Sequence, residues 1–455
     1  MPTAYTILFL LLILVAAATW IIPAGSYDYV DGVPVAGTYH TVEQNPQGVG
    51  DVLKAAFSGF YDAVDVCIFI LMVGGFLGVV MKTGAVDAGV GNVIRLLGGR
   101  EKWLIPILML LFGLGGTTYG MWEETMAFYP LLIPVFLAAG YDAVVGISVI
   151  LLGAGAGVIA STVNPFATGI AAGFAGVSLG EGIVLRLLEW VAFEVAAIWF
   201  VMAYAAKVKK NPSNSVVGVG AGKIQVSMDQ QVPFTAKRKV IMALFTLTFL
   251  IMVYAVVPFD EMGLSLPALG WWFPELSALF LVAGVVIGLI DRMSEEELVE
   301  TYVAGCADLL GVAFIIGISR GITVLMNDGA ITDTVLHWGE QALSGAGAIS
   351  FTLLVFALYL PLTILIPSSS GLATLSIPIV APLGKFAGVG GDLVVTAFQS
   401  ASGLVNIITP TAAVVMGALA LGHVPYDRWV KYVWKLILWF LLLALAFLVA
   451  GVLLG

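Results

Sequence analysis

Charge is scarce in this sequence. Only 11% of its 455 residues are Asp, Glu, Lys or Arg, whereas a soluble domain carries about 25%. Such a chain cannot cover a water-facing surface, and its 60% hydrophobic content and mean hydropathy of +1.05 predict an integral membrane protein. Its apolar runs are about 20 residues long rather than alternating segments of about 10, which favours helical spans over an outer-membrane barrel. We therefore expect a multi-pass protein of the inner (plasma) membrane, with the lipid bilayer as its surroundings.

Basic residues, cysteines and enzyme motifs are also few. The formal net charge of −10 argues against nucleic acid, whose recognition needs a basic face. Cys67 and Cys306 lie in apolar runs, so we expect free thiols. The chain has no His-Glu-x-x-His pair, and Val389 breaks the membrane aspartyl-protease pattern at Gly390-Gly391-Asp392. We expect neither catalysis nor a cofactor.

Apolar runs divide the chain into spans. Seven runs are uninterrupted: Ala4–Ile22, Asp62–Met81, Gly182–Ala206, Val240–Val257, Trp272–Ile290, Ala304–Met326 and Trp429–Leu454. Four more are broken by polar residues or proline: Trp103–Ala139, Asp142–Ala175, Ile349–Phe386 and Leu393–Leu421. These four interruptions are the most informative feature of the sequence.

Lys and Arg predict the orientation, because basic loops stay in the cytoplasm. Basic residues cluster before the first broken run, at both ends of residues 207–239, and before the last span. Placing all three clusters inside makes 103–139 and 349–386 re-entrant hairpins, while 142–175 and 393–421 cross once. The result is an all-α protein of about nine full spans and two hairpins, with a cytoplasmic linker at 207–239. Its N-terminus is then cytoplasmic and its C-terminus outside.

The two halves, 1–206 and 240–455, resemble each other. Gly59-Phe60-Tyr61-Asp62 matches Gly305-Cys306-Ala307-Asp308, Asn164-Pro165 matches Thr409-Pro410, and the hairpin tips fall at corresponding places. The span 272–290 has no counterpart, and one added span inverts everything after it. Inverted repeats with discontinuous helices favour a secondary transporter whose site lies at the midplane between the repeats.

The four breaks are therefore the predicted site. Irregular backbone survives at membrane depth only where protein or a water-filled cavity satisfies its polar groups. Helix N-termini suit a carboxylate and helix C-termini suit a cation. No break contains Lys or Arg, so helix ends and hydroxyl groups are expected to recognise a carboxylate. The candidate substrate ligands are Glu123, Glu124, Thr125, Asn164, Ser368, Ser369, Ser370, Asn406, Thr409 and Thr411; those for a coupling Na⁺ or H⁺ are Glu123, Ser161 and Thr162. The alternative is ordinary helix-turn chemistry.

Glu123 and Glu124 carry the sharpest signal. A carboxylate at mid-depth costs about 2.5–3.5 kcal/mol, so an adjacent pair must be solvated, paired or protonated. The pair could hold an ammonium or guanidinium group, bind Na⁺ or carry H⁺; alternatively, it solubilises a hairpin tip in an aqueous vestibule. Asp62, Asp65 and Asp308 stand at the starts of predicted spans, where we expect interfacial or capping roles.

The motifs at the breaks resemble a known family. Glu123-Glu124-Thr125, Ile366–Leu372 and the stretch from Gln399 to Thr411 are similar to the YfcC-like branch of the anaerobic four-carbon-dicarboxylate carrier family, within the ion-transporter superfamily. The resemblance covers nearly the whole chain. It implies that each chain folds as two inverted repeats, with a scaffold domain and a moving transport domain, and that two chains form a homodimer. It also implies that Na⁺ and a carboxylate bind at hairpin tips with the sequence Ser-Asn-Thr. In this chain the tips instead have the sequences Glu-Glu-Thr and Ser-Ser-Ser. The YfcC-like branch is associated with exchange of basic amino acids, which two carboxylates at a tip would suit.

The expected function is secondary active transport of a small carboxylate-bearing metabolite by alternating access. An amino acid is the favoured substrate, a basic one among the choices, by exchange or ion coupling. The alternatives are a dicarboxylate carrier coupled to Na⁺ or H⁺ and, more remotely, a channel or an intramembrane enzyme.

Overall fold

The computed structural model describes residues 4–30, 33–86, 88–89, 100–118, 120–178, 180–218, 233–256, 266–267, 269–271 and 273–454. The fold is mostly helical. The first half contains α1 (Ala4–Ala18), α2 (Val49–Asp62), α3 (Val64–Lys82), α5 (Leu104–Thr118), α6 (Tyr129–Ala138), α7 (Ala143–Ile159), α8 (Ile170–Ala175) and α9 (Ile183–Lys210). The second contains α10 (Ala236–Val256), α11 (Phe273–Asp291), α12 (Glu295–Asp328), α13 (Thr332–Leu343), α14 (Ala348–Leu365), α15 (Ser369–Phe386), α16 (Gly391–Asn406), α17 (Ala413–Leu421) and α18 (Tyr426–Leu454).

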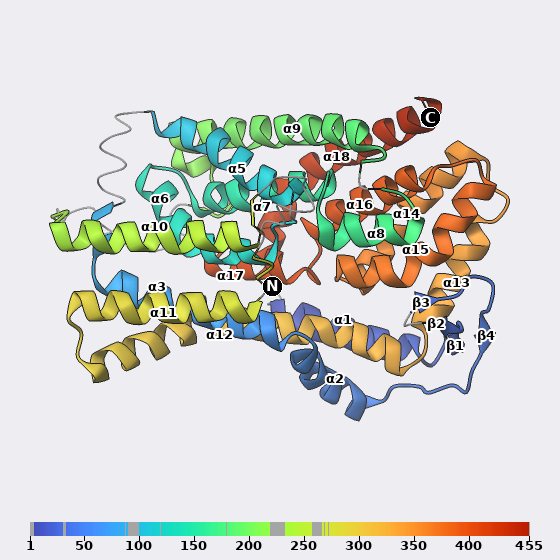
Figure 1. Ribbon diagram of the computed structural model, residues 1–455, viewed down its shortest axis with the longest axis horizontal. Coiled ribbons are helices and arrows are strands. Elements are labelled where there is room, and N and C mark those ends of the chain that lie inside the picture. Colours follow the sequence, from blue (N-terminus) through green and yellow to red (C-terminus); the bar gives the residue numbers. More distant parts are fainter. Residues whose placement is uncertain are drawn as a thin grey trace.

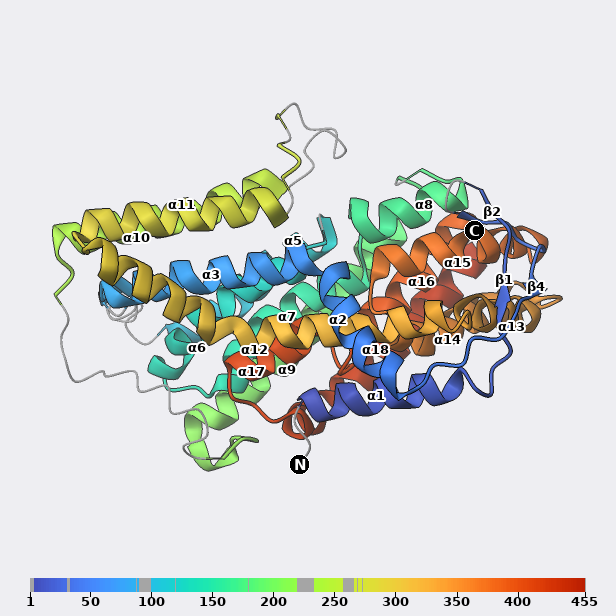
Figure 2. The ribbon, with the colours of Figure 1, turned by 90° about the horizontal axis from the view of Figure 1, so that it is seen from below.

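Short elements complete the chain. Four are single turns or slightly longer: η1 (Glu101–Trp103), η2 (Glu123–Phe128), η3 (Pro165–Gly169) and η4 (Pro212–Asn214). Four two-residue strands, which the sequence does not predict, form two antiparallel pairs: β1 (Gly25–Ser26) with β4 (His40–Thr41), and β2 (Tyr29–Val30) with β3 (Val33–Pro34). In Figures 1 and 2 these strands lie beside α13, at the end of the molecule opposite α10 and α11.

The described helices include five that are long and apolar enough to cross a membrane, namely α3, α11, α12, α14 and α18. Helices α1 and α7 are apolar but shorter. The longest, α12, begins where the Ser294 hydroxyl accepts a hydrogen bond from the backbone N–H of Glu297 (3.1 Å), the usual N-cap arrangement. Because α12 starts at Glu295 rather than near Ala304, Asp308 lies inside the helix. The expectation that Asp308 caps the start of a span is therefore wrong.

Two groups of helices make up the molecule (Figure 1). In the α12 group, α2 and α3 pack along α12, α11 packs on α3, α10 on α11 and α1 on α12. In the α7–α16 group, α7 packs against α5, α9 and α16, and α16 also contacts α14, α15 and α18. Helices α1, α2, α3, α11 and α12 lie in the lower part of Figure 1, and the two groups meet where α12 contacts α17, which also packs on α7.

Glycines allow α12 to approach its neighbours closely. A Cβ atom on Gly59 would overlap the carbonyl oxygen of Gly317, and one on Gly74 would collide with the carbonyl oxygen of Gly305. These pairs show that the α2–α3 segment runs antiparallel to α12, since the residue number rises along one partner as it falls along the other. Small residues at such interfaces let helix backbones pack against each other. This packing places the end of α2 beside the second half of α12.

Each of the four broken runs is interrupted in the structure. The first hairpin tip (120–122) separates α5 from η2 and α6, and the second hairpin tip (366–368) separates α14 from α15. The first helix break (160–164) follows α7, and the second helix break (407–412) follows α16. One boundary differs from the prediction: Glu123, Glu124 and Thr125 form the first turn of η2 instead of irregular backbone.

Candidate functional site

A cavity of about 200 Å³ lies where the two helix groups meet. Both hairpin tips, the first helix break and the end of α16 line it from one side, while α2, α3, α11 and α12 supply the other. The polar side chains that line it are Asp62, Asp65, Glu123, Glu124, Asn164, Arg320, Ser368, Ser369, Ser370 and Asn406. The cavity thus brings together seven of the residues that the sequence predicts at the site.

The first hairpin tip presents two carboxylates. Glu124 is buried, and its Oε2 accepts a hydrogen bond from the backbone N–H of Trp122 (3.1 Å). Glu123 is half-buried. Gly120, with a φ of +77°, lets this tip approach the first helix break, because a Cβ there would overlap the side-chain amide of Asn164. The tip therefore packs against Asn164 through Gly120, and its two carboxylates line the same cavity as the Asn164 amide.

The second hairpin tip presents hydroxyl groups and a helix N-terminus. The Ser368 hydroxyl caps the 18-residue helix α15 by accepting a hydrogen bond from the backbone N–H of Gly371 (3.2 Å). Its Oγ lies 3.4 Å from that of Ser370, and all three serines are half-buried. The positive end of the helix dipole and these hydroxyls favour a negatively charged group.

Asn164 and Asn406 bring amide groups from the two broken helices. Both are 3% exposed. The Oδ1 of Asn406 is buried without a hydrogen-bond partner among the described residues. An unsatisfied buried oxygen beside a cavity is a ready acceptor for a donor on a ligand.

The other five predicted site residues do not line the cavity. The Thr125 hydroxyl donates to the backbone oxygen of Trp122, and that of Thr162 donates to the backbone oxygen of Thr117 (2.9 Å). The hydroxyls of Thr409 and Thr411 pair with each other (2.9 Å). The Ser161 hydroxyl is buried and makes no hydrogen bond within the described part of the chain. Most of these side chains satisfy groups at the breaks themselves.

Three charged residues of the cavity come from the α12 group: the sequence predicts interfacial or capping roles for Asp62 and Asp65, and Arg320 was not among the predicted site residues. Asp62 ends α2, Asp65 lies in the first turn of α3, and Arg320 lies in the second half of α12. The Nε of Arg320 is 3.8 Å from Oδ2 of Asp62. The sequence does contain one sign of this side of the cavity, namely Arg320, because an Arg within a long apolar run indicates a functional position. No break contains a basic residue, but Arg320, which lies outside the breaks in sequence, lines the same cavity as they do.

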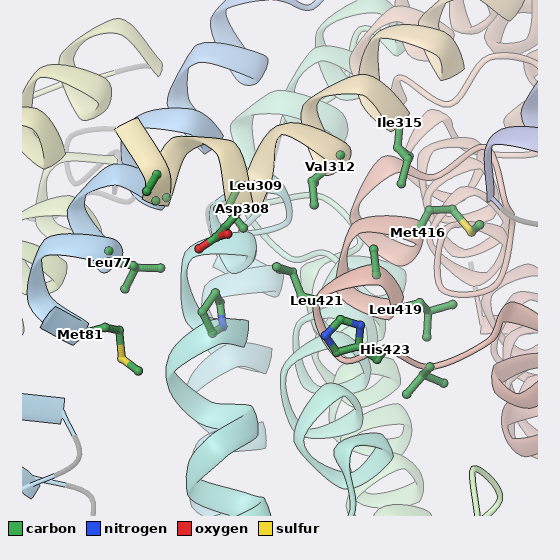
Figure 3. Close-up of a pocket in the computed structure, with 18 of the residues that line it drawn as sticks. Leu77, Met81, Asp308, Leu309, Val312, Ile315, Met416, Leu419, Leu421 and His423 are labelled. Carbon is green, nitrogen blue, oxygen red and sulfur yellow. The ribbon is translucent and has the colours of Figure 1, made fainter. Parts of the chain in front are cut away.

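A second cavity, of about 1180 Å³, also lies between the helix groups (Figure 3). Helices α3 and α12 line one side, and α17 with the turn that follows it lines the other. Its walls are mainly aliphatic, and Asp308 and His423 are among the polar residues that face it. Side chains therefore do not fill the space between the two helix groups where α3 and α12 face α17.

Two spacings typical of enzymes have structural roles here. Gly317-Ile318-Ser319-Arg320-Gly321 has the Gly-x-Ser-x-Gly spacing of a hydrolase nucleophile, but it lies within α12 rather than at a strand-to-helix turn, and Ser319 donates to the backbone oxygen of Thr411. Gly48-Val49-Gly50-Asp51 fits Gly-x-Gly-Asp, but Asp51 accepts a hydrogen bond from the backbone N–H of Gly48 (3.0 Å) at the start of α2.

Apolar helices, paired breaks and an inner polar cavity are features of a membrane transporter. The sequence profile of the C4-dicarboxylate anaerobic carrier family matches residues 1–453, and the chain belongs to that family. This confirms the resemblance inferred from the motifs. The chain is therefore a multi-pass membrane protein of a transporter family.

Two relatives align along almost the whole chain. An uncharacterised protein of Haemophilus influenzae is 35% identical, over 99% of this chain and 97% of its own length. The putative basic amino acid antiporter YfcC of Escherichia coli is 31% identical, over 95% of this chain and 92% of its own.

Solved transporter structures are more distant. The YdaH transporter of Alcanivorax borkumensis shares 14% identity with a TM-score of 0.45, covering 98% of both chains. MtrF of Neisseria gonorrhoeae, from a class of antimetabolite efflux pumps, shares 17% identity with a TM-score of 0.43, covering 98% of this chain and 94% of that one.

Proposed function

We propose that this protein is a secondary transporter of basic amino acids. The observation that carries the proposal is the charge of the smaller cavity, where four carboxylates face one guanidinium and give a formal charge of −3 when all are ionised. A basic amino acid, with net charge +1, reduces this imbalance, whereas a dicarboxylate would add two negative charges. Two unit charges at 4 Å interact by about 4 kcal/mol at an effective dielectric constant of 20, so the sign of the substrate matters.

The two hairpin tips have different roles in this proposal. Glu123 and Glu124 hold the ammonium or guanidinium group of the side chain, while Ser368, Ser369 and Ser370 at the N-terminus of α15 face the carboxylate. Asn164 and Asn406 supply amide groups for the α-amino group and carboxylate. Thr125, Thr409 and Thr411 support the backbone of the breaks.

Coupling to an ion is a further part of the proposal. Glu123 is the candidate carrier of H⁺, because it faces the cavity and is less buried than Glu124. If Na⁺ is the coupling ion, Ser161 is the candidate ligand at the first helix break, because its buried hydroxyl has no hydrogen-bond partner among the described residues, while the Thr162 hydroxyl is already bonded to Thr117.

Movement between the two helix groups would give alternating access. The α12 group corresponds to a scaffold and the α7–α16 group to a transport domain, with the larger cavity between them as space into which α17 and α6 can move. We also propose that 1–206 and 240–455 form inverted repeats with nine full spans and two hairpins, joined by a cytoplasmic linker, and that the protein is a homodimer.

A dicarboxylate carrier coupled to Na⁺ or H⁺ is the second candidate. The description of the family favours it, as do Arg320 and the serines of the second tip. Counterflow in proteoliposomes separates the candidates. Vesicles preloaded with unlabelled L-arginine should take up labelled L-arginine several times faster than empty vesicles, and preloading with succinate should have no effect. Stimulation by succinate alone would favour the dicarboxylate carrier, and saturation without any stimulation from inside would exclude exchange.

Labelling of single cysteines tests the proposed topology. In a background where Cys67 and Cys306 are replaced by Ala, N214C and A342C place thiols at exposed positions in η4 and α13. A membrane-impermeant maleimide should label A342C in intact cells, but should label N214C only after the membrane is opened, because basic loops stay inside. If both label from the same side, the inverted-repeat proposal is wrong.

A further inference from the structure

Arg320 is the only Lys or Arg among the described residues that line the smaller cavity. It lies within α12, a helix long and apolar enough to cross a membrane. A guanidinium in such a helix is costly and is normally held by a partner or a polar cavity. Its bonding partners therefore indicate its role.

The guanidinium is poorly satisfied within the protein. Its Nε lies 3.8 Å from Oδ2 of Asp62, which is an ion pair but too long for a hydrogen bond. It forms no hydrogen bond to any residue that the structure describes. The Asp62 side chain is 56% exposed and that of Arg320 is 28% exposed. A guanidinium with five N–H donors is thus left with one loose, solvated ion pair and a longer-range charge interaction with Glu123, and its hydrogen-bonding capacity is unused among the described residues.

A purely structural ion pair would look different. Arg and a carboxylate that stabilise each other usually form two parallel N–H···O bonds of about 2.7–2.9 Å. Here the geometry leaves the guanidinium fork open, and Ser368, Ser369 and Ser370 line the same cavity. The planar fork matches the two oxygens of a carboxylate, so the cavity combines its one basic group with the hydroxyls and helix N-terminus already described.

We propose that Arg320 binds the α-carboxylate of the substrate, which replaces Asp62 as the partner of the guanidinium. This inference rests on the proposed function and adds a selectivity rule to it. Arg320 of the α12 group holds the carboxylate together with the Ser368–Ser370 hydroxyls, and Glu123 and Glu124 hold the side-chain cation. A ligand then needs both charged ends, and a diamine without the carboxylate binds only one half of the site.

Matched ligands test this rule on the purified full-length protein. L-Arginine and agmatine carry the same guanidinium, and agmatine lacks only the carboxylate. The wild type should bind L-arginine at least about tenfold more tightly, since a charge-assisted bidentate contact is lost with agmatine. R320Q should remove this preference by weakening L-arginine binding, and it should not weaken agmatine binding, because agmatine has no carboxylate for Arg320 to hold. R292Q is the control, because Arg292 is exposed at the turn between α11 and α12.

The possible outcomes distinguish the role of Arg320 from the proposed transport of basic amino acids. If R320Q keeps the wild-type preference for L-arginine, Arg320 does not bind the carboxylate and the inference is wrong, although the proposed function stands. If the wild type binds neither compound, the proposed function itself fails. Should R320Q not fold, as judged by gel filtration and thermal unfolding, the double variant D62N/R320Q removes both charges of the pair, and the same loss of preference is expected.

Discussion

Replacing Glu124 with Gln should weaken binding of L-arginine by about tenfold or more, while replacing Glu123 with Gln should stop accumulation. Glu124 is buried, and a hydrogen bond from the Trp122 backbone N–H holds its carboxylate in place at the cavity, where in our proposal it holds the cation of the substrate. Glutamine preserves its shape and removes the charge pairing. Glu123 is less buried and faces the cavity, and Gln there mimics its protonated form. Exchange can then continue, but a proton gradient can no longer drive net uptake.

Both variants are measured in the same proteoliposomes. Equilibrium counterflow reports exchange, and uptake with an imposed pH gradient reports accumulation. A neutral analogue, L-citrulline, controls for general damage, because E124Q should affect its binding much less than that of L-arginine. Unchanged affinity, pH dependence and accumulation in both variants would mean that the carboxylates only solvate the hairpin tip.

Replacing Ser368, Ser369 and Ser370 together with Ala should lower substrate affinity by about 1.5–3 kcal/mol, or roughly 10- to 150-fold, the cost of losing a hydrogen bond to a charged group. The hydroxyls line the cavity at the start of α15. Loss of the Ser368 cap should also cost about 1 kcal/mol of stability. Substrate affinity and thermal unfolding must therefore be measured together.

The matched control replaces three exposed serines, Ser213, Ser344 and Ser350, with Ala. It should change neither affinity nor thermal stability appreciably. Wild-type affinity in the cavity triple variant would show that the Ser368–Ser370 run is a helix turn without a binding role.

The four interruptions could be predicted from sequence because their signals are local. Pro, Ser, Asn and adjacent Glu residues within apolar runs mark places where a membrane helix cannot continue unsupported. Each of the four predicted runs is therefore interrupted in the structure, and the second hairpin tip ends where Ser368 caps α15. The roles of Thr162, Thr409 and Thr411 were harder to predict, since a hydroxyl near a break can face a ligand or satisfy the freed backbone.

The basic residue of the cavity could not be found from local patterns. Arg320 reaches Asp62 only because α12 packs antiparallel to α2 and α3 through facing glycines, bringing positions more than 250 residues apart together. Asp308 was misplaced for a related reason. The apolar run begins only at Ala304, because the residues before it are more polar, whereas the helix extends from Glu295 to Asp328.

Ligand-induced stabilisation of the purified protein tests the central claim most directly, namely that the acidic cavity selects basic amino acids. A ligand that binds only the folded state raises the free energy of unfolding by about 2.7 kcal/mol at 100 times its Kd. L-Arginine, L-lysine and L-ornithine should therefore raise the midpoint of thermal unfolding in a concentration-dependent way, and succinate, fumarate and L-malate should not, with or without Na⁺. Stabilisation by the dicarboxylates and none by the basic amino acids would contradict the proposed selectivity.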